Sequence, residues 1–128
     1  YLVNNAKNNK TFLFHNNFNK NKINFLKSKK IKLIFTPLLN SNLDFGYILK
    51  ELYLREVSSV LVEGGKSLTF SLLSENFFNE FYLFISSSKL KNKGFLSVKK
   101  IKSQLSKKFK YIKYNETFLD KDNLVHYY

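Results

Sequence analysis

The sequence predicts an α/β domain in which helices flank a mostly parallel central sheet. Short runs of β-branched, aromatic and aliphatic residues alternate along the chain with segments whose apolar residues recur at helical spacing. The chain has 128 residues, a length that favours one domain, and 44% of them are hydrophobic, which is enough for a core. Wholesale disorder is therefore not expected.

The N-terminal segment predicts one strand and one short helix. Residues 1–10, rich in Asn and Lys, are interpreted as a strand end followed by a loop. Residues 11–15 predict a strand, and the polar residues 16–21 predict a turn. The following helix ends in the lysine-rich residues 27–30 and is predicted from three apolar residues, Ile23, Phe25 and Leu26.

A second strand and a longer helix follow. Residues 31–35 predict the strand, which ends before Thr36-Pro37 because proline cannot donate a hydrogen bond to a ladder. Asp44 is the expected N-cap of a helix that runs to about Glu56. Its apolar residues are spaced by three, four and seven: Phe45, Ile48, Leu49 and Leu52.

The middle of the chain predicts strand, helix and strand again. Residues 58–62 predict a buried strand, because apolar and β-branched residues fill both faces, and Glu63-Gly64-Gly65 ends it. A helix is expected over residues 66–75, and a strand over residues 80–85. The buried residues expected in the helix are Leu68, Leu72 and Leu73.

The C-terminal segment predicts strands over residues 109–114 and 124–128. Asp120 and Asp122 resemble a carboxylate pair, but the sequence around them, residues 119–123, is typical of a hairpin turn. The order of elements supports helices covering a sheet.

The net charge of +13 has two interpretations. All but one of the 22 basic residues are Lys, the exception being Arg55. Lysine is favoured by AT-rich codons, whereas a nucleic-acid site selected for phosphate and base contacts favours arginine. A solvated lysine surface is therefore preferred over a nucleic-acid interface, including for the lysine run of residues 99–110. Either way, the charge attracts small anionic ligands.

Several classes of protein are excluded by composition. The chain has no Cys, which excludes disulfides, Cys-based zinc sites and thiol nucleophiles. His15 and His126 are the only histidines, so no metal site is expected, and both are interpreted as ordinary strand-end residues. No apolar run reaches the roughly 20 residues of a membrane helix, and no signal peptide is recognised, so a cytoplasmic protein without membrane contact is expected. Because the chain has no Met and begins at Tyr1, it is expected to be part of a longer protein.

One stretch, residues 60–69, has the pattern of a ligand site. An apolar strand leads into Gly64 and Gly65, which let the backbone approach a ligand, and the next helix presents unpaired N–H groups to an anion. Lys66, Ser67 and Thr69 add a charge and two hydroxyls. Two glycines alone leave a second interpretation open, a tight turn with Ser67 as helix cap. The spacing matches neither a P-loop nor a dinucleotide fingerprint.

Glu63 is the sharpest single candidate. It follows the apolar strand directly, at the edge where open α/β sheets bind ligands. Its carboxylate could bind ligand hydroxyls, pair with a nearby lysine, or be solvated.

Residues 59–85 resemble the C-terminal reductase domain of the bifunctional riboflavin-biosynthesis deaminase–reductase. The resemblance rests on the strand ending in Val-Glu-Gly-Gly, the helix opening that follows, and Asn79-Glu80 at the family's Asp-Glu position. It is strong over residues 43–85 and faint on either side.

The resemblance implies a dihydrofolate-reductase-like fold and an enzyme of riboflavin biosynthesis. Members reduce 5-amino-6-(5-phosphoribosylamino)uracil to its ribitylamino form with NADPH. Glu63 would contact this pyrimidine ribose phosphate, while no catalytic residue is assigned. The cofactor's pyrophosphate would be held by Gly64, Gly65, Lys66, Ser67, Leu68, Thr69 and Ser71.

The chain also departs from the family pattern. It has Ser86-Ser87-Ser88 where the family has a proline, and these serines lack a Gly-x-Ser-x-Gly nucleophile context. The family's first strands, with their Lys-x-Ala-x-Ser-x-Asp-Gly-like and Ala-Asp-Asn-Pro-like segments, are expected upstream of Tyr1. Residues 1–128 are therefore interpreted as the C-terminal part of one reductase domain, inactive alone.

A dimer is expected, because the sheet edges of an incomplete domain would seek partners. Two alternatives stay open: a basic, non-catalytic nucleic-acid-binding α/β domain, and a degenerate reductase homologue retained for assembly. Nucleic acid is the less favoured partner.

Overall fold

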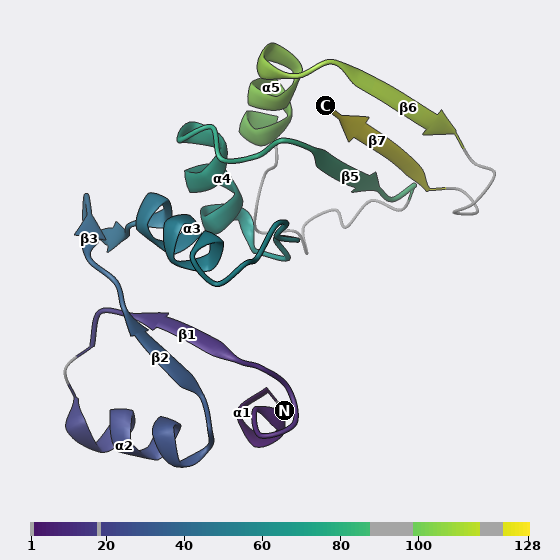
Figure 1. The fold of residues 1–128 in the computed structure, drawn as a ribbon. Coiled ribbons are helices and arrows are strands. Elements are labelled where there is room, and N and C mark those ends of the chain that lie inside the picture. The colour runs from purple at the N-terminus through teal and green to yellow at the C-terminus, as the bar shows by residue number, and fades with distance from the viewer. Residues whose placement is uncertain (1, 18, 88–98, 116–121) are drawn as a thin grey trace, which may run out of the picture. The chain divides into compact units, whose positions relative to one another are not determined.

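The computed structural model describes residues 2–17, 19–87, 99–115 and 122–128 (Figure 1). The chain divides into two compact units, Tyr1–Val60 and Leu61–Tyr128.

The N-terminal unit is built around a parallel strand pair. Strands β1 (Phe12–His15) and β2 (Lys32–Phe35) pair from Phe12 opposite Lys32 to His15 opposite Phe35. Helix α2 (Lys20–Ser28) connects them, which makes a β–α–β unit (Figure 1). Both strands and the helix are confirmed. The predicted strand end within residues 1–10 is wrong, because residues Leu2–Asn5 form the short helix α1.

A small hairpin precedes the next helix. Strands β3 (Leu38–Leu39) and β4 (Asn42–Leu43) pair antiparallel. The two residues between them, Asn40 and Ser41, have φ values of 50° and 65°. Positive φ at both central residues is the geometry of the tight turns that match strand twist.

Helix α3 (Phe45–Tyr53) begins as predicted and ends earlier than predicted. The Asp44 side chain accepts a hydrogen bond from the Tyr47 N–H at 2.9 Å, which confirms it as the N-cap. The helix ends at Tyr53, before the predicted limit near Glu56, which lies in the left-handed region at φ 63°. This residue closes the helix, with the Val57 N–H donating to the Leu52 carbonyl at 3.2 Å.

The predicted buried strand over residues 58–62 does not form. Residues 57–65 have no regular secondary structure, and Val60 and Leu61 are 48% and 83% exposed. A strand requires a neighbour to pair its N–H and C=O groups, and no strand among the described residues pairs with this segment. Apolar, β-branched composition is therefore not sufficient here to produce a strand.

The C-terminal unit packs two helices against an antiparallel sheet. Its helices are α4 (Lys66–Ser74) and α5 (Lys99–Lys108), and the sheet order is β5-β7-β6. The strands are β5 (Phe81–Ile85), β6 (Tyr111–Asn115) and β7 (Asn123–Tyr127). Strands β6 and β7 pair antiparallel, and Asp120 with most of the predicted hairpin turn, residues 119–123, lies outside the described residues.

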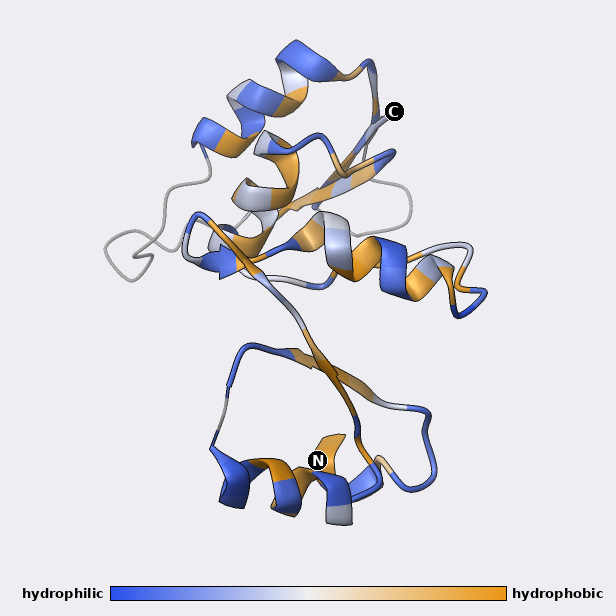
Figure 2. Cartoon of the chain, turned by 60° about the vertical axis from the view of Figure 1, so that its left-hand side comes forward, coloured by the Kyte–Doolittle hydropathy of each residue, from blue (hydrophilic) through white to orange (hydrophobic). Residues whose placement is uncertain are grey.

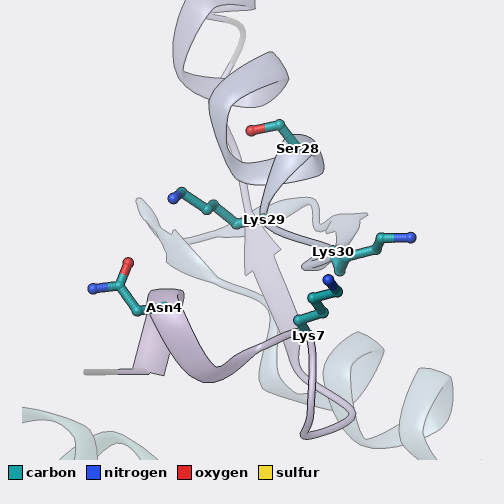
Figure 3. Close-up of a pocket in the computed structure, with 5 residues that line it drawn as sticks. All are labelled: Asn4, Lys7, Ser28, Lys29 and Lys30. Atoms are coloured by element: carbon teal, nitrogen blue, oxygen red, sulfur yellow. The ribbon is translucent and has the colours of Figure 1, made fainter.

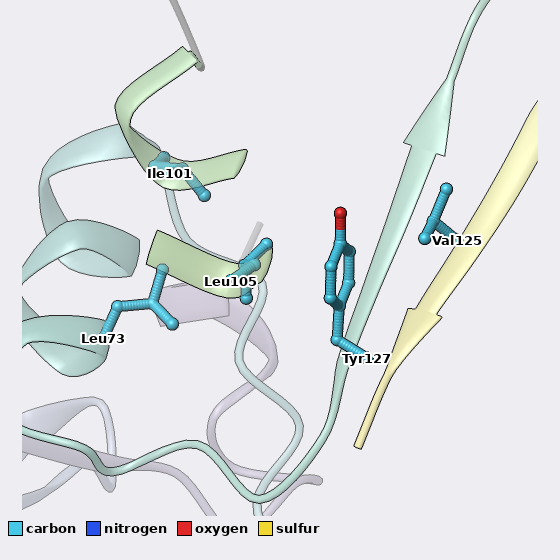
Figure 4. Packing of buried hydrophobic residues seen from close by; sticks show 5 residues of the cluster. All are labelled: Leu73, Ile101, Leu105, Val125 and Tyr127. Atoms are coloured by element: carbon cyan, nitrogen blue, oxygen red, sulfur yellow. The ribbon is translucent and has the colours of Figure 1, made fainter. Parts of the chain in front are cut away.

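The core of this unit joins the two helices to the sheet. Its buried cluster draws one residue from α4, two from α5 and two from β7 (Figure 4): Leu73, Ile101, Leu105, Val125 and Tyr127. Leu72 is buried as predicted, whereas Leu68 is only half-buried. Alternate residues of β5 pack against the cluster, as the two-residue period of a strand requires.

The mixed α/β class is confirmed, while the sheets differ in detail from the expectation. The described residues contain one parallel pair, β1–β2, and otherwise antiparallel pairs. Helix α5 was not predicted, because lysines dominate its sequence and leave only short hydrophobic stretches (Figure 2). The spacing of Ile101 and Leu105, four residues apart and both buried, was the available signal.

Candidate functional site

The start of helix α4 differs from the starts of the other two nine-residue helices. Asn19 caps α2 by accepting the Lys22 N–H at 3.0 Å, and Asp44 caps α3 in the same way. The cap of α4 is Gly65, which has no side chain to accept a hydrogen bond. The first N–H groups of α4 are therefore left for an acceptor from outside the helix.

The two glycines before α4 have different environments. A Cβ atom placed on Gly64 would lie 2.5 Å from Leu68 Cδ2 and 3.1 Å from Leu68 Cβ, so this position is closed by the first turn of the helix. A Cβ atom on Gly65 would meet nothing within 4 Å. Gly64 thus serves packing, while the space beside Gly65 is open to a ligand.

The side chains at the start of α4 differ in how far they are exposed to solvent. Ser67 is exposed and lies within α4, so the interpretation of Ser67 as the cap is wrong. Lys66 and Thr69 are half-buried, as is Ser71 one turn farther along. Together with the uncapped N–H groups, these residues offer one positive charge and three hydroxyls in the first two turns of one helix.

Glu63 is exposed immediately before the glycines. The described residues contain two ion pairs, Arg55 with Glu51 and His126 with Glu80, and Glu63 belongs to neither. Its carboxylate is therefore accessible to a ligand, although it follows an irregular segment rather than the predicted strand.

The carboxyl ends of β1 and β2 form a second place where a ligand could bind, and the sequence analysis did not identify it. Asn16 Nδ2 donates to the Thr36 carbonyl at 2.7 Å and ties the two strand ends together. The Asn17 N–H donates to His15 Nδ1 at 3.2 Å. Ligands of open α/β sheets bind outside the carboxyl ends of parallel strands, so these asparagines are candidate polar contacts. Only the parallel pairing identifies this edge.

His126 has a partner that the sequence does not suggest. Its Nε2 lies 3.1 Å from Glu80 Oε2, and the Tyr82 hydroxyl donates to the same oxygen at 2.9 Å. The Tyr82 and His126 rings stack, with centroids 4.3 Å apart. Because Tyr82 and His126 are directly opposite in the β5–β7 register, this cluster has a structural explanation in sheet pairing.

Comparison with protein families identifies the chain. The model of the RibD C-terminal domain matches residues 1–106. The chain belongs to the RibD C-terminal domain family. Its fold is dihydrofolate-reductase-like, and its role is that of a pyrimidine reductase of the riboflavin pathway. The search of curated proteins found no match.

Membership in the RibD C-terminal domain family confirms the resemblance stated from the Val-Glu-Gly-Gly segment. The family match contains Glu63 and the whole of α4, whereas His126 and strand β7 lie beyond its last residue.

One lysine of α5 has a structural role. Lys108 Nζ donates hydrogen bonds to the Leu73 carbonyl and to Asn76 Oδ1, both at 2.6 Å.

No helix among the described ranges is long and apolar enough to cross a bilayer.

Proposed function

We propose that this chain is the C-terminal part of one reductase domain that uses NADPH to reduce 5-amino-6-(5-phosphoribosylamino)uracil to its ribitylamino form, in the cytoplasm. The observation that carries the proposal is the uncapped start of α4, directly behind Glu63, in a chain of this family. Both proposed ligands are anionic, and the net charge of +13 favours them.

The residues at the start of α4 fit a pyrophosphate. The free N–H groups and the positive end of the helix dipole favour negative charge, and the open space beside Gly65 admits it. The Lys66 ammonium adds a cation, and Ser67 and Thr69 add hydroxyl donors. NADPH, when bound, supplies the hydride; these residues bind and orient it.

Leu68 and Ser71 are proposed to support the cofactor site, Leu68 by packing and Ser71 by its hydroxyl. Leu68 packs against Gly64 and thereby fixes the approach of the loop to the helix. Ser71 lies one turn after Ser67, where its hydroxyl extends the polar side of the helix start. Leu68 is accordingly assigned to the backbone shape of the cofactor site rather than to a polar contact.

Glu63 is the proposed substrate contact. An exposed carboxylate accepts hydrogen bonds from neighbouring hydroxyls, and the substrate's ribose carries such hydroxyls. This role is binding and orientation. No residue is assigned to proton transfer.

The exposed segment around Val60 and Leu61 supports an incomplete domain. Burying such apolar side chains and pairing their backbone requires a strand that the described residues do not supply. We propose that a strand outside this sequence pairs there, so that residues 1–128 alone do not turn over substrate. The open edges of the short sheets likewise support a dimer.

Binding measurements on the natural protein test these roles separately. Lys66→Ala should weaken NADPH binding roughly tenfold, the effect of losing one charge-assisted contact of about 1.4 kcal/mol. Lys50→Ala removes an exposed lysine of α3 and is the matched control, expected within twofold of the natural protein. Equal weakening by both variants would reject the cofactor site.

Glu63→Gln tests the substrate role. It should lower affinity for the pyrimidine ribose phosphate roughly tenfold while leaving NADPH affinity within twofold. Fluorescence titration with NADPH and calorimetry with the substrate measure the two affinities independently. Unchanged substrate affinity would remove Glu63 from the site.

A further inference from the structure

The lysines around the pocket of the N-terminal unit do not gather at one point. The pocket has a volume of about 290 Å³ and five lining residues (Figure 3): Asn4, Lys7, Ser28, Lys29 and Lys30. The side chains of Lys29 and Lys30 point away from each other, so they do not surround a single ligand. Dispersed lysines and a net charge of +13 instead make two copies of this chain repel each other wherever such surfaces meet.

One face of the β5-β7-β6 sheet differs from these lysine-bearing surfaces. The side toward α4 and α5 carries the buried residues Val125 and Tyr127 (Figure 4) and, on β5, Phe81 and Leu83. Because side chains alternate along a strand, the residues between them lie on the opposite side, which we call the outer face. Its apolar and aromatic residues include Tyr82, Phe84, Ile112, Leu124 and Tyr128.

The outer face is open to solvent in the part of the chain that the structure describes. Four of its apolar residues are between 44% and 64% exposed: Tyr82, Phe84, Ile112 and Tyr128. At about 200 Å² for a large side chain, each leaves roughly 100 Å² uncovered, so the patch offers about 400 Å². Apolar patches of this size often mark interaction sites, and about 400 Å² is half of what each partner buries in a standard interface.

The rows of residues across the outer face follow from the strand register. The middle row joins the three strands through directly opposed residues: Tyr82, His126 and Ile112. The adjacent row is centred on Tyr128, whose N–H and carbonyl both form hydrogen bonds of 3.0 Å with the backbone of Lys110. Its third member is Glu80, two positions before Tyr82 on the β5 side.

This adjacent row has opposite charges at its two ends. Glu80 lies on the outer face, because its Oε2 accepts a hydrogen bond from the Tyr82 hydroxyl at 2.9 Å and is 3.1 Å from His126 Nε2. Lys110 is exposed and follows Phe109, which packs against the core, so alternation places Lys110 on the outer face. The row therefore has an acid at the β5 side, an aromatic ring in the middle and a base at the β6 side.

This order of charges is complementary to itself. A two-fold axis parallel to the strands, between two such faces, places the β5 side of each copy against the β6 side of the other. Glu80 of one copy then faces Lys110 of the partner subunit, and the pair occurs twice. The apolar middle of the face meets its own copy, which is the composition expected at the centre of an interface.

We propose that a second copy of this chain docks on the outer face of the β5-β7-β6 sheet, with Glu80 of each copy beside Lys110 of the partner subunit. The proposal rests on the dimer proposed above and specifies its surface. It locates the contact on a sheet face, whereas the open sheet edges indicate only that the chain seeks a partner. It uses no residue of the proposed cofactor site.

Sedimentation velocity of the natural protein at about 0.15 M salt, where long-range repulsion is screened, measures the dimer. Phe84→Lys places a charge within the outer face and should raise the dissociation constant at least tenfold. Tyr53→Lys replaces an exposed aromatic residue of α3, in the other unit, and is the matched control, expected within twofold of the natural protein. Equal effects of the two variants, or a dimer that Phe84→Lys leaves intact, overturn the proposal.

Melting temperatures separate loss of docking from loss of folding. Because Phe84 is largely exposed, Phe84→Lys should melt like the natural protein at low protein concentration, while only the natural protein gains stability as the concentration rises. A melting temperature that Phe84→Lys lowers equally at every concentration, with the dimer intact, assigns the outer face to another segment of the same chain and overturns the proposal.

Charge reversal tests the arrangement of the two copies. Glu80→Lys and Lys110→Glu each bring like charges together and should each weaken the dimer at least fivefold, although they shift the net charge in opposite directions. The double variant Glu80→Lys/Lys110→Glu restores the pair at an unchanged net charge and should return to within twofold of the natural protein. A double variant no tighter than the single variants, or single variants that act in opposite directions, overturns the arrangement.

NADPH titration distinguishes failure of this proposal from failure of the proposed reductase. Phe84→Lys should bind NADPH within twofold of the natural protein, because the outer face does not include the start of α4. A natural protein that binds NADPH as a monomer overturns the docking surface and leaves the cofactor site standing. A dimer that Phe84→Lys disrupts, in a protein without NADPH affinity, supports the docking surface and rejects the cofactor site.

Discussion

The two units bury their apolar residues differently. In the C-terminal unit, five buried residues from two helices and one strand form a single cluster. In the N-terminal unit, the buried residues are Ala6 just after α1, Ile34 within β2, and Ile31 and Thr36 on either side of that strand, while neither α2 nor α3 buries any residue. The C-terminal unit therefore has its own core, whereas the N-terminal unit has isolated buried positions.

This difference separates helix formation from helix burial. Helix α3 has the clearest apolar spacing of the chain, yet its apolar residues are half-buried or exposed. Half of the residues of helix α5 are lysine, yet it buries Ile101 and Leu105 almost completely. Spacing predicts that a helix has an apolar side; what that side contacts depends on the neighbouring elements.

The largest expected effect tests whether the C-terminal cluster is a true core. Leu105 is 0% exposed, so Leu105→Ala should destabilise this unit by about 2–5 kcal/mol through lost contacts and a cavity. Leu26→Ala in α2 is the matched helix variant in the other unit, and its half-buried side chain should cost about 1 kcal/mol. Urea unfolding followed through amide signals of each unit measures both. Similar losses of unfolding free energy in the two variants would contradict the difference in burial between the two units.

The next effect tests the contrast between the two glycines. Gly64→Ala should destabilise the start of α4 by about 1–3 kcal/mol, because its Cβ atom would overlap Leu68. Gly65→Ala should change stability by less than about 0.5 kcal/mol, since its Cβ atom meets open space. Urea unfolding of both variants provides the comparison. A cost for Gly65→Ala as large as that for Gly64→Ala would contradict the assignment.

Local signals predicted the starts of helices better than they predicted strands and long-range contacts. The start of α4 at Lys66 follows from two glycines before a helical pattern, and Asp44 is recognisable as a cap from its side chain alone. The strand expected over residues 58–62 failed because pairing depends on a neighbour elsewhere in the chain. Likewise, the contact between His126 and Glu80 spans 46 positions and carries no local pattern.

The unequal roles of the glycines were also beyond the sequence. The two glycines are adjacent in the chain, and it is the position of the Leu68 side chain that distinguishes their environments. The parallel pairing of β1 and β2 also could not be predicted from the sequence, and it is this pairing that makes Asn16 and Asn17 candidate ligand contacts. Such features require three-dimensional contacts between residues that are four or more positions apart.

A smaller effect is expected at Asp44, the N-cap of helix α3 in the N-terminal unit. Asp44→Ala removes the acceptor of the Tyr47 N–H and should destabilise this unit by about 1 kcal/mol. Asp44→Asn retains a cap and should recover most of the loss. Amide exchange of α3 and β2 measures the effect, which should leave α5 and β7 unchanged. Equal losses in both units would argue against their independence.

The smallest effect joins the cap comparison to the proposed ligand. Gly65→Ser gives α4 the side-chain acceptor that α2 and α3 already have, and should stabilise the helix by a few tenths of a kcal/mol. The same hydroxyl occupies the N–H groups and part of the open space that a pyrophosphate would use, so NADPH affinity should fall as stability rises. Thermal unfolding and NADPH titration of the natural protein and this variant measure the opposing trends. If stability and affinity rise together, the start of α4 is an ordinary helix end and the pyrophosphate must bind elsewhere.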